Sequence, residues 1–281
     1  MEKLSLKTGY NRLILIFSLI WIVLSILFAF IDLEISRSVV DFGSGPGRFV
    51  EHFGGIPGLV LVEFAFFIFA GNIRSKTGLI RYLLLGLVAT ITMVIPYFSF
   101  KTLFLSIKSL KGFFLSEKYF ILLFFGIVSV LMIFIFRTVL KNFSEKQRYF
   151  SFITVQLFLY CYVFLTHILK YFSGRVRFRD LTEGFSSFTP WYLFNGPNGN
   201  SSFPSGHTVL AWLLLPLILV FINGKKTIRI GVISALVTWG VFVSVFRVII
   251  GAHYASDVLF SSGLTILFFL FLFKKYNVGD R

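Results

Sequence analysis

Residues 227–273 read TIRIGVISALVTWGVFVSVFRVIIGAHYASDVLFSSGLTILFFLFLF, and this stretch decides the fold. It contains two apolar runs, Thr227–Arg247 and Ala255–Phe273, on either side of a short turn. Each run has about 20 residues, which is the length an α-helix needs to cross the hydrocarbon core of a bilayer. The stretch therefore predicts a transmembrane helical hairpin, and the turn that joins its helices carries His253.

Other apolar segments of similar length precede this hairpin. They are Leu13–Ile31, Ile56–Asn72, Leu79–Phe100, Tyr119–Phe136, Tyr149–Lys170 and His207–Asn223. The second is the weakest, because Glu63 lies in its middle and an ionisable group inside a membrane is costly; we expect Glu63 to make a structural hydrogen bond. The sequence shows no internal repeat or Ser/Gly-rich linker. It predicts a single all-α membrane domain over residues 1–281, a polytopic transmembrane helical bundle with about eight spans.

The composition excludes an ordinary soluble protein. Hydrophobic residues make up 57% of the chain and charged residues only 14%, whereas soluble domains carry about a quarter charged residues. The net charge of +15 would suggest nucleic-acid binding in a soluble chain. Here the basic residues lie between apolar segments, where they set topology and meet anionic lipid headgroups, so we expect no nucleic-acid partner. The lone cysteine, Cys161, excludes an internal disulfide framework.

The basic residues also predict the orientation, since cytoplasmic loops of membrane proteins are enriched in Lys and Arg. With the N-terminus in the cytoplasm, most of the 27 Lys and Arg residues fall on the cytoplasmic side. This predicts cytoplasmic N- and C-termini and places the longest polar loop, Tyr171–Gly206, on the outer face of the cell membrane. The first run is long for a signal peptide and no small-x-small cleavage pattern follows it, so we expect Leu13–Ile31 to be retained.

Two further segments of the outer face carry polar residues. Asp32–Gly55 is rich in glycine and indicates a loop with a short helix. Lys101–Lys118 interleaves Phe and Leu with lysine, as amphipathic segments at a membrane interface do. This second segment is either a snorkelling connector or a platform that gathers anionic lipids, and the sequence leaves both open.

Three polar clusters fall at the outer face in the predicted topology. They are Lys170 and Arg177 at a Lys-x6-Arg spacing, Pro204-Ser205-Gly206-His207, and Arg247, His253 and Asp257 at an Arg-x5-His-x3-Asp spacing. The three cations suit a phosphate, because phosphoryl transfer spreads negative charge over the phosphate oxygens. Gly206 lets the backbone approach an anion, Ser205 adds a hydroxyl, and the helix that starts near His207 points N–H groups at it. The clusters therefore predict a phosphate site.

In this order the clusters resemble the motifs of the type 2 phosphatidic acid phosphatase (PAP2) superfamily, which includes bacterial membrane lipid phosphatases. The family pattern is Lys-x6-Arg-Pro, then Pro-Ser-Gly-His, then Ser-Arg-x5-His-x3-Asp. The resemblance covers roughly residues 149–273, so we expect a PAP2-like catalytic core there and N-terminal helices over residues 1–148. Two positions depart from the pattern, since Phe178 replaces the proline and Phe246 replaces the serine. Neither change touches a proton-transferring or nucleophilic group, so we expect activity to survive both.

The resemblance also implies roles. His253 would be the nucleophile that forms a phosphohistidine, and His207 the general acid that protonates the leaving oxygen. Asp257 lies one helical turn beyond His253, at i+4, where it can accept the imidazole N–H. Phosphate would be bound by Lys170, Arg177, Ser205, Gly206 and Arg247. Three cations would repel a divalent metal, so we expect no metal and no other cofactor.

Arg175 and Arg179 flank Arg177 in the sequence. Each is either an interfacial anchor or a contact to the lipid headgroup, and the residues alone favour neither.

Together these patterns predict an integral-membrane phosphatase that hydrolyses a phosphomonoester or diphosphate of a lipid. Candidate substrates are undecaprenyl diphosphate, phosphatidylglycerophosphate, phosphatidic acid and a lipid A phosphate, among which the sequence does not choose. One alternative is a member of the same superfamily that uses a soluble phosphate or transfers phosphate to a lipid. Another is a non-enzymatic lipid-phosphate binder or transporter. The sequence gives no indication of the oligomeric state.

Overall fold

The computed structural model of the chain describes residues 2–73 and 143–276, and every regular element in these ranges is a helix. The long helices are α1 (Glu2–Val39), α3 (Ile56–Ile73), α6 (Glu145–Leu157), α10 (Lys226–Ile249) and α11 (Ala255–Lys275). The predicted all-α fold is confirmed over the described residues. Within residues 2–73 and 143–276, five stretches of helix are long and apolar enough to cross a membrane, as judged by length and composition.

The number of spans is not established. The predicted spans 79–100 and 119–136 and the segment Lys101–Lys118 all lie outside the described residues. Glu63, on α3, is half-buried and makes no hydrogen bond to any described residue, so the structural bond expected for it is not seen there.

Helix α1 is longer than predicted. The sequence indicated a loop from Asp32 onwards, because the segment Asp32–Gly55 is rich in glycine. In the structure the helix continues to Val39, and the Asp32 side chain is only 1% exposed. The short helix expected in the following loop is present as α2 (Gly45–Phe53), and it starts where the Ser44 hydroxyl accepts a hydrogen bond from the backbone N–H of Gly47 at 3.2 Å.

The predicted span His207–Asn223 is helical over most of its length, but it is not one continuous α-helix. The segment is divided into α8 (Gly206–Trp212), the 3-10 helix η4 (Leu215–Leu217) and α9 (Ile218–Phe221). Pro216 accounts for the break, because proline has no N–H and its ring clashes with the preceding helical turn.

The predicted span Tyr149–Lys170 is helical throughout but changes its winding. It consists of α6, the π-helix η1 (Phe158–Thr166) and α7 (His167–Ser173). Helix α7 ends at Gly174, which adopts the left-handed conformation with φ 51° that an L side chain adopts only with strain. The turn at this glycine separates Lys170, still on the helix, from Arg175 in the loop.

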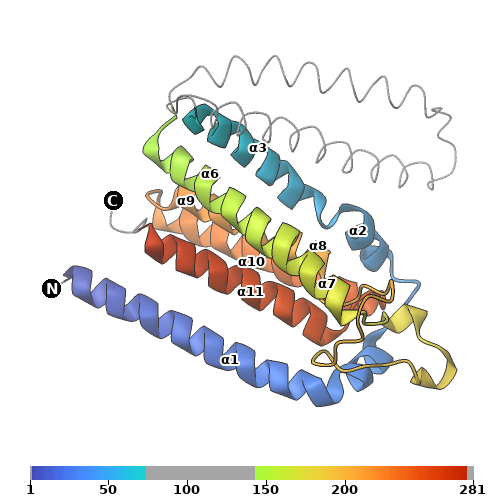
Figure 1. Cartoon of the computed structure of the whole chain (residues 1–281). Coiled ribbons are helices and arrows are strands. Elements are labelled where there is room, and N and C mark those ends of the chain that lie inside the picture. The colour runs from blue at the N-terminus through green and yellow to red at the C-terminus, as the bar shows by residue number, and fades with distance from the viewer. Residues whose placement is uncertain (1, 74–142, 277–281) are drawn as a thin grey trace, which may run out of the picture.

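The helices run side by side in an elongated bundle (Figure 1). α1 packs along α11 and α3 packs along α6. α1 begins and α11 ends at the same end of the bundle, whereas α2 and the loop between α7 and α8 gather at the opposite end. That loop end contains the three polar clusters.

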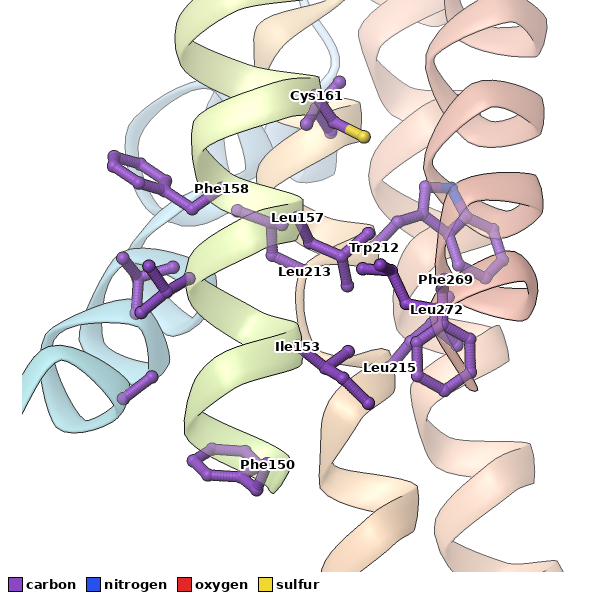
Figure 2. Close-up of a cluster of buried hydrophobic side chains, with 14 of the residues drawn as sticks. Phe150, Ile153, Leu157, Phe158, Cys161, Trp212, Leu213, Leu215, Phe269 and Leu272 are labelled. Atoms are coloured by element: carbon purple, nitrogen blue, oxygen red, sulfur yellow. The ribbon is translucent and has the colours of Figure 1, made fainter. Parts of the chain in front are cut away.

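An apolar core holds the bundle together around α6. Figure 2 shows part of a cluster made by α3, α6, η1, the α8–η4 segment and α11, to which Phe150, Ile153, Leu157, Phe158, Cys161, Trp212, Leu213, Leu215, Phe269 and Leu272 belong. Because lipid tails are as apolar as these side chains, close packing rather than removal from water stabilises such a core in a membrane.

Candidate active site

The turn between α10 and α11 brings the third cluster together. The backbone N–H groups of Ala252 and His253 both donate to the carbonyl of Arg247 at 3.2 Å. Gly251 makes this turn possible, because its φ is 67° and a Cβ there would lie 2.9 Å from the ring of Phe42. The backbone therefore folds back so that His253 lies beside the end of α10 that carries Arg247.

His253 is held in one tautomer. Its ring is buried, and its Nδ1 lies 2.6 Å from the carbonyl oxygen of Ser202. A carbonyl can only accept, so Nδ1 carries the proton and Nε2 keeps its lone pair. Burial lowers the pKa of His253 to about 3, although the neighbouring carboxylate of Asp257 acts to raise it. The imidazole is therefore neutral at physiological pH, with a free lone pair on Nε2.

Asp257 lies one turn beyond His253 as predicted, but its short bonds go elsewhere. Its Oδ2 accepts from the hydroxyl of Ser202 at 2.5 Å and from the N–H of Tyr254 at 2.9 Å. The same oxygen lies 3.5 Å from Nδ1 of His253. Asp257 thus orients the histidine largely through Ser202, which bonds both of them.

The second cluster begins helix α8. Ser205 is fully buried, and its hydroxyl caps the helix by accepting from the backbone N–H of Thr208 at 3.4 Å. His207 Nε2 lies 3.1 Å from the carbonyl oxygen of Glu51 in α2, so this nitrogen carries the ring proton. A Cβ on Gly206 would lie in ordinary van der Waals contact with the ring of Tyr162, at 3.6 Å.

The three predicted cations, Lys170, Arg177 and Arg247, form what we call the cationic triad. Lys170 Nζ donates to the carbonyl of Ser201, whose hydroxyl accepts from Arg177 Nη2 at 3.1 Å. Arg247 is only 3% exposed, yet its Nε and Nη1 have no hydrogen-bond partner among the described residues, and the same holds for Arg177 Nε. Buried guanidinium donors are costly when unpaired, so this triad fits an anion that supplies acceptors.

Three residues of the site were missed by sequence reasoning. Ser201 and Ser202 precede the Pro-Ser-Gly-His motif, and only their nearness to it could have indicated them. Glu51, on α2, lies far away in sequence. Its Oε1 is 2.7 Å from Arg179 Nη1 and 3.7 Å from Arg247 Nη1, so a carboxylate borders the triad.

The two residues that depart from the family pattern lie in apolar surroundings. The ring of Phe178 stacks on Phe185 with the centroids 5.7 Å apart. Phe246 packs against Phe242, with a centroid separation of 4.7 Å. Both replacements therefore make packing contacts. Groups of three or more His, Cys, Asp or Glu that could hold a metal are absent from the described part of the chain.

Comparison with known proteins agrees with this geometry. Residues 148–279 match the sequence profile of the PAP2 superfamily. This region belongs to the PAP2 superfamily. The predicted membership is thus confirmed, and all the residues of the three clusters lie inside the matching PAP2 region.

A curated relative matches part of the same chain. Phosphatidylglycerophosphatase B of Haemophilus influenzae is 31% identical over 117 residues, which cover 37% of this chain and 48% of the relative. The chain therefore spans about half the length of the curated relative it matches. No solved structure matches the chain.

Proposed function

We propose that the protein is a membrane phosphatase that hydrolyses the phosphate ester or diphosphate of a lipid at the loop end of the bundle. The observation that carries this proposal is that Arg177 and Arg247 keep buried guanidinium nitrogens without a hydrogen-bond partner among the described residues. Membership of the PAP2 superfamily and the likeness to a protein named phosphatidylglycerophosphatase B support phosphatase activity. The apolar helices that carry the site support a substrate that reaches it from the bilayer.

The first chemical step is attack by Nε2 of His253 on phosphorus. A new N–P bond forms as the P–O bond to the lipid breaks, and the leaving oxygen takes a proton from the imidazolium form of His207, which becomes neutral. The cationic triad stabilises the charge on the equatorial oxygens. As His253 becomes positively charged, the Ser202 carbonyl and the Asp257 carboxylate stabilise its Nδ1–H.

Water completes the reaction. It attacks the phosphohistidine, gives its proton to His207, and releases inorganic phosphate while the electron pair of the N–P bond returns to His253. In the structure the Nε2 proton of His207 is bonded to the Glu51 carbonyl. A neutral imidazole is too weak an acid for this step, so the proton given to the leaving oxygen is a second ring proton, which the negative charge of a bound phosphate stabilises.

No step in this mechanism is routed through a metal, because the cationic triad supplies the positive charge next to the histidines. The test uses purified protein in detergent with EDTA, and it measures phosphate released from the four candidate lipids. Glycerol 3-phosphate serves as a soluble comparison that copies a headgroup. We expect release from at least one lipid, no loss with EDTA, and at least a ~10³-fold loss in the matched variant His253→Asn.

The other outcomes of this assay separate the alternatives. Release from glycerol 3-phosphate alone would favour a soluble substrate. No release from any substrate, with orthovanadate still bound, would favour a lipid-phosphate binder. Strong inhibition by EDTA would contradict the metal-free mechanism.

We also propose that the loop end faces the outside of the cell membrane, with both termini in the cytoplasm. Pro197 is exposed in the loop between α7 and α8, and Lys226 is exposed at the start of α10. In a Cys161→Ser background, Pro197→Cys should react with an impermeant maleimide in intact cells, and Lys226→Cys only after lysis. The reverse pattern would overturn this orientation.

A further inference from the structure

A second, fully buried charge network lies behind His253 and Asp257. We call it the buried arginine network: Arg175 lies between two carboxylates, Asp32 on α1 and Asp257 on α11. Arg175 Nη2 is 2.8 Å from Asp32 Oδ2, and its Nη1 is 2.6 Å from Asp257 Oδ1. The exposed fractions of the three side chains are 0%, 1% and 0%. The sequence left open whether Arg175 is an interfacial anchor or a contact to the lipid headgroup. Because its side chain is fully buried, it is neither.

All three nitrogen atoms of the Arg175 guanidinium are used inside the protein. Nε donates to the carbonyl of Thr189 at 2.8 Å, and Nη1 also donates to the hydroxyl of Ser256 at 2.8 Å. The guanidinium carbon lies 4.0 Å from the centre of the Tyr254 ring, in cation–π contact. Arg175 is therefore a fully bonded part of the framework.

Asp32 is fixed on the other side by the first turn of α11. Its Oδ1 accepts from the backbone N–H of Ser256 at 2.9 Å, and its Oδ2 accepts from the Ser256 hydroxyl. Further along α1, the indole N–H of Trp21 donates to the carbonyl of Leu259 at 3.1 Å. α1 thus lies along α11, and the Asp32 carboxylate contacts the first turn of α11, directly after the turn that carries His253. α1 itself is outside the PAP2 region of residues 148–279.

The geometry of a guanidinium explains what Asp32 does. Arginine and carboxylate commonly pair through two parallel hydrogen bonds. Here Asp32 occupies Nη2, so Arg175 engages Asp257 through Nη1 and Oδ1. The other oxygen, Oδ2, is left for Ser202, and it lies beside Nδ1 of His253.

We propose that Asp32 is a positioning residue for the reaction. It keeps Arg175 from chelating Asp257, so that Asp257 and Ser202 hold His253 with Nε2 toward the phosphate. Helix α1 therefore completes the active site of the PAP2 region. This inference rests on the proposed function.

The test is Asp32→Asn in the full chain, assayed on the lipid that the wild type hydrolyses best. Orthovanadate, which copies the geometry of phosphorus during transfer, counts the sites able to bind. We expect kcat per vanadate site to fall about 10–100-fold, the range seen when residues that orient a reactive group are removed. KM and vanadate affinity should stay within about twofold, because none of the cationic triad contacts Asp32.

Two variants on the same helix serve as controls. Glu34→Gln removes the same charge from an exposed position two residues away, and Ser36→Ala removes a buried hydroxyl one turn away. Both should keep kcat within about twofold of the wild type. A loss of similar size in either control would mean that any damage to α1 slows the reaction, and would overturn the inference.

A double-mutant cycle tests the route through Arg175. Lysine is a point charge that cannot bridge Asp32, Asp257 and Thr189 together, so Arg175→Lys should also lower kcat. Asp32→Asn should then add little to it, whereas independent effects would multiply. If Asp32→Asn gives no vanadate-binding protein, Ser256→Ala replaces it in the cycle, since this variant removes contacts to both Asp32 and Arg175 without removing a charge.

The two proposals fail in different ways. A wild type that releases phosphate from no lipid contradicts the proposed function. An active wild type with an unchanged kcat in Asp32→Asn, or a loss confined to KM or to the number of sites, contradicts the positioning role alone.

Discussion

Arg175 and Arg177 are two residues apart in one loop, yet they lie in opposite surroundings. Arg175 is fully buried, pairs with two carboxylates, and donates from each of its nitrogens. Arg177 is half-buried, donates to one serine hydroxyl, and keeps a buried Nε that has no partner in the described part of the chain. The same residue type therefore belongs to the framework at one position and is available to an anion at the other.

This difference separates the cations of the site into those whose donors are all bonded within the protein and those with unpaired donors. When every nitrogen of a buried guanidinium has an acceptor in the protein, its burial carries little free-energy penalty, and it has no free donor for a substrate. A buried guanidinium with spare donors is costly in the free protein, and a phosphate offsets that cost when it binds. Arg247 resembles Arg177 in this respect, so we assign Arg175 to the framework and propose the cationic triad as the phosphate site.

The largest expected effect is on stability, and it should separate Arg175 from Arg177. Arg175→Met leaves two carboxylates buried without their cation and should lower the free energy of unfolding by about 3–5 kcal/mol. Arg177→Met breaks no ion pair and should change it by less than about 0.5 kcal/mol. Thermal unfolding in detergent measures both variants. Equal losses would remove the distinction on which the comparison rests.

The next effect is on catalysis, where Arg247 should behave as a binding-site cation. Arg247→Ala should lower kcat/KM about 10²–10³-fold, because charge-assisted bonds to the transition state are lost. The melting temperature should not fall, since a buried cation with unpaired donors is removed. Inorganic phosphate should raise the melting temperature of the wild type and not of this variant. A marked drop in stability would place Arg247 with Arg175 instead.

A third test concerns His253, which lies beside both groups of arginines. Its pKa is about 3 in the folded chain, against an ordinary value near 6.5, so the unfolded chain binds the extra proton between these pH values. Stability should therefore fall as pH drops from about 6.5, by up to about 1.4 kcal/mol per pH unit from this group. His253→Asn keeps a donor for the Ser202 carbonyl and lacks the titration. Its melting temperature should fall less than that of the wild type between pH 7 and pH 5, and an equal fall would contradict a neutral His253.

The smallest effect should come from Glu51, whose carboxylate borders the cationic triad. Its Oε1 lies 3.7 Å from Arg247 Nη1, where it repels an incoming phosphate. Glu51→Gln should therefore lower the inhibition constant of inorganic phosphate, by about two- to fivefold because Glu51 is partly exposed and screened. Asp41→Asn, an exposed carboxylate after α1, is the charge-matched control. Weaker phosphate inhibition in Glu51→Gln would mean that Glu51 instead holds Arg247 in place for the substrate.

The sequence predicted the helical class, the family and the residues of the three clusters, because apolar length and motif spacing are local properties. It placed His253 and Asp257 one helical turn apart, and the structure has them there. It did not predict that Ser202 would bond both of them. That contact depends on the path of the loop between α7 and α8, which no local pattern encodes.

The network around Asp32 was missed for a different reason. A charged residue at the end of an apolar run indicates the end of a membrane span, and burial is the exception that a partner makes possible. Asp32 is buried because Arg175 and Ser256, far away in sequence, neutralise and bond it. In the same way, Pro216 divides α8 from α9 within a run whose hydropathy predicted one helix. The burial of Asp32 thus depends on its tertiary partners, and the break at Pro216 depends on the missing backbone N–H.

The central claim, that the cationic triad holds a phosphate for attack by His253, is tested most directly by trapping the intermediate. Purified protein would be mixed with a ³²P-labelled lipid phosphate and quenched in alkaline detergent, because phosphohistidine is stable to alkali and labile to acid. We expect label on the peptide that contains His253, no label in His253→Asn, and longer-lived label in His207→Asn. Steady phosphate release by His253→Asn, or label on any other residue, would contradict it.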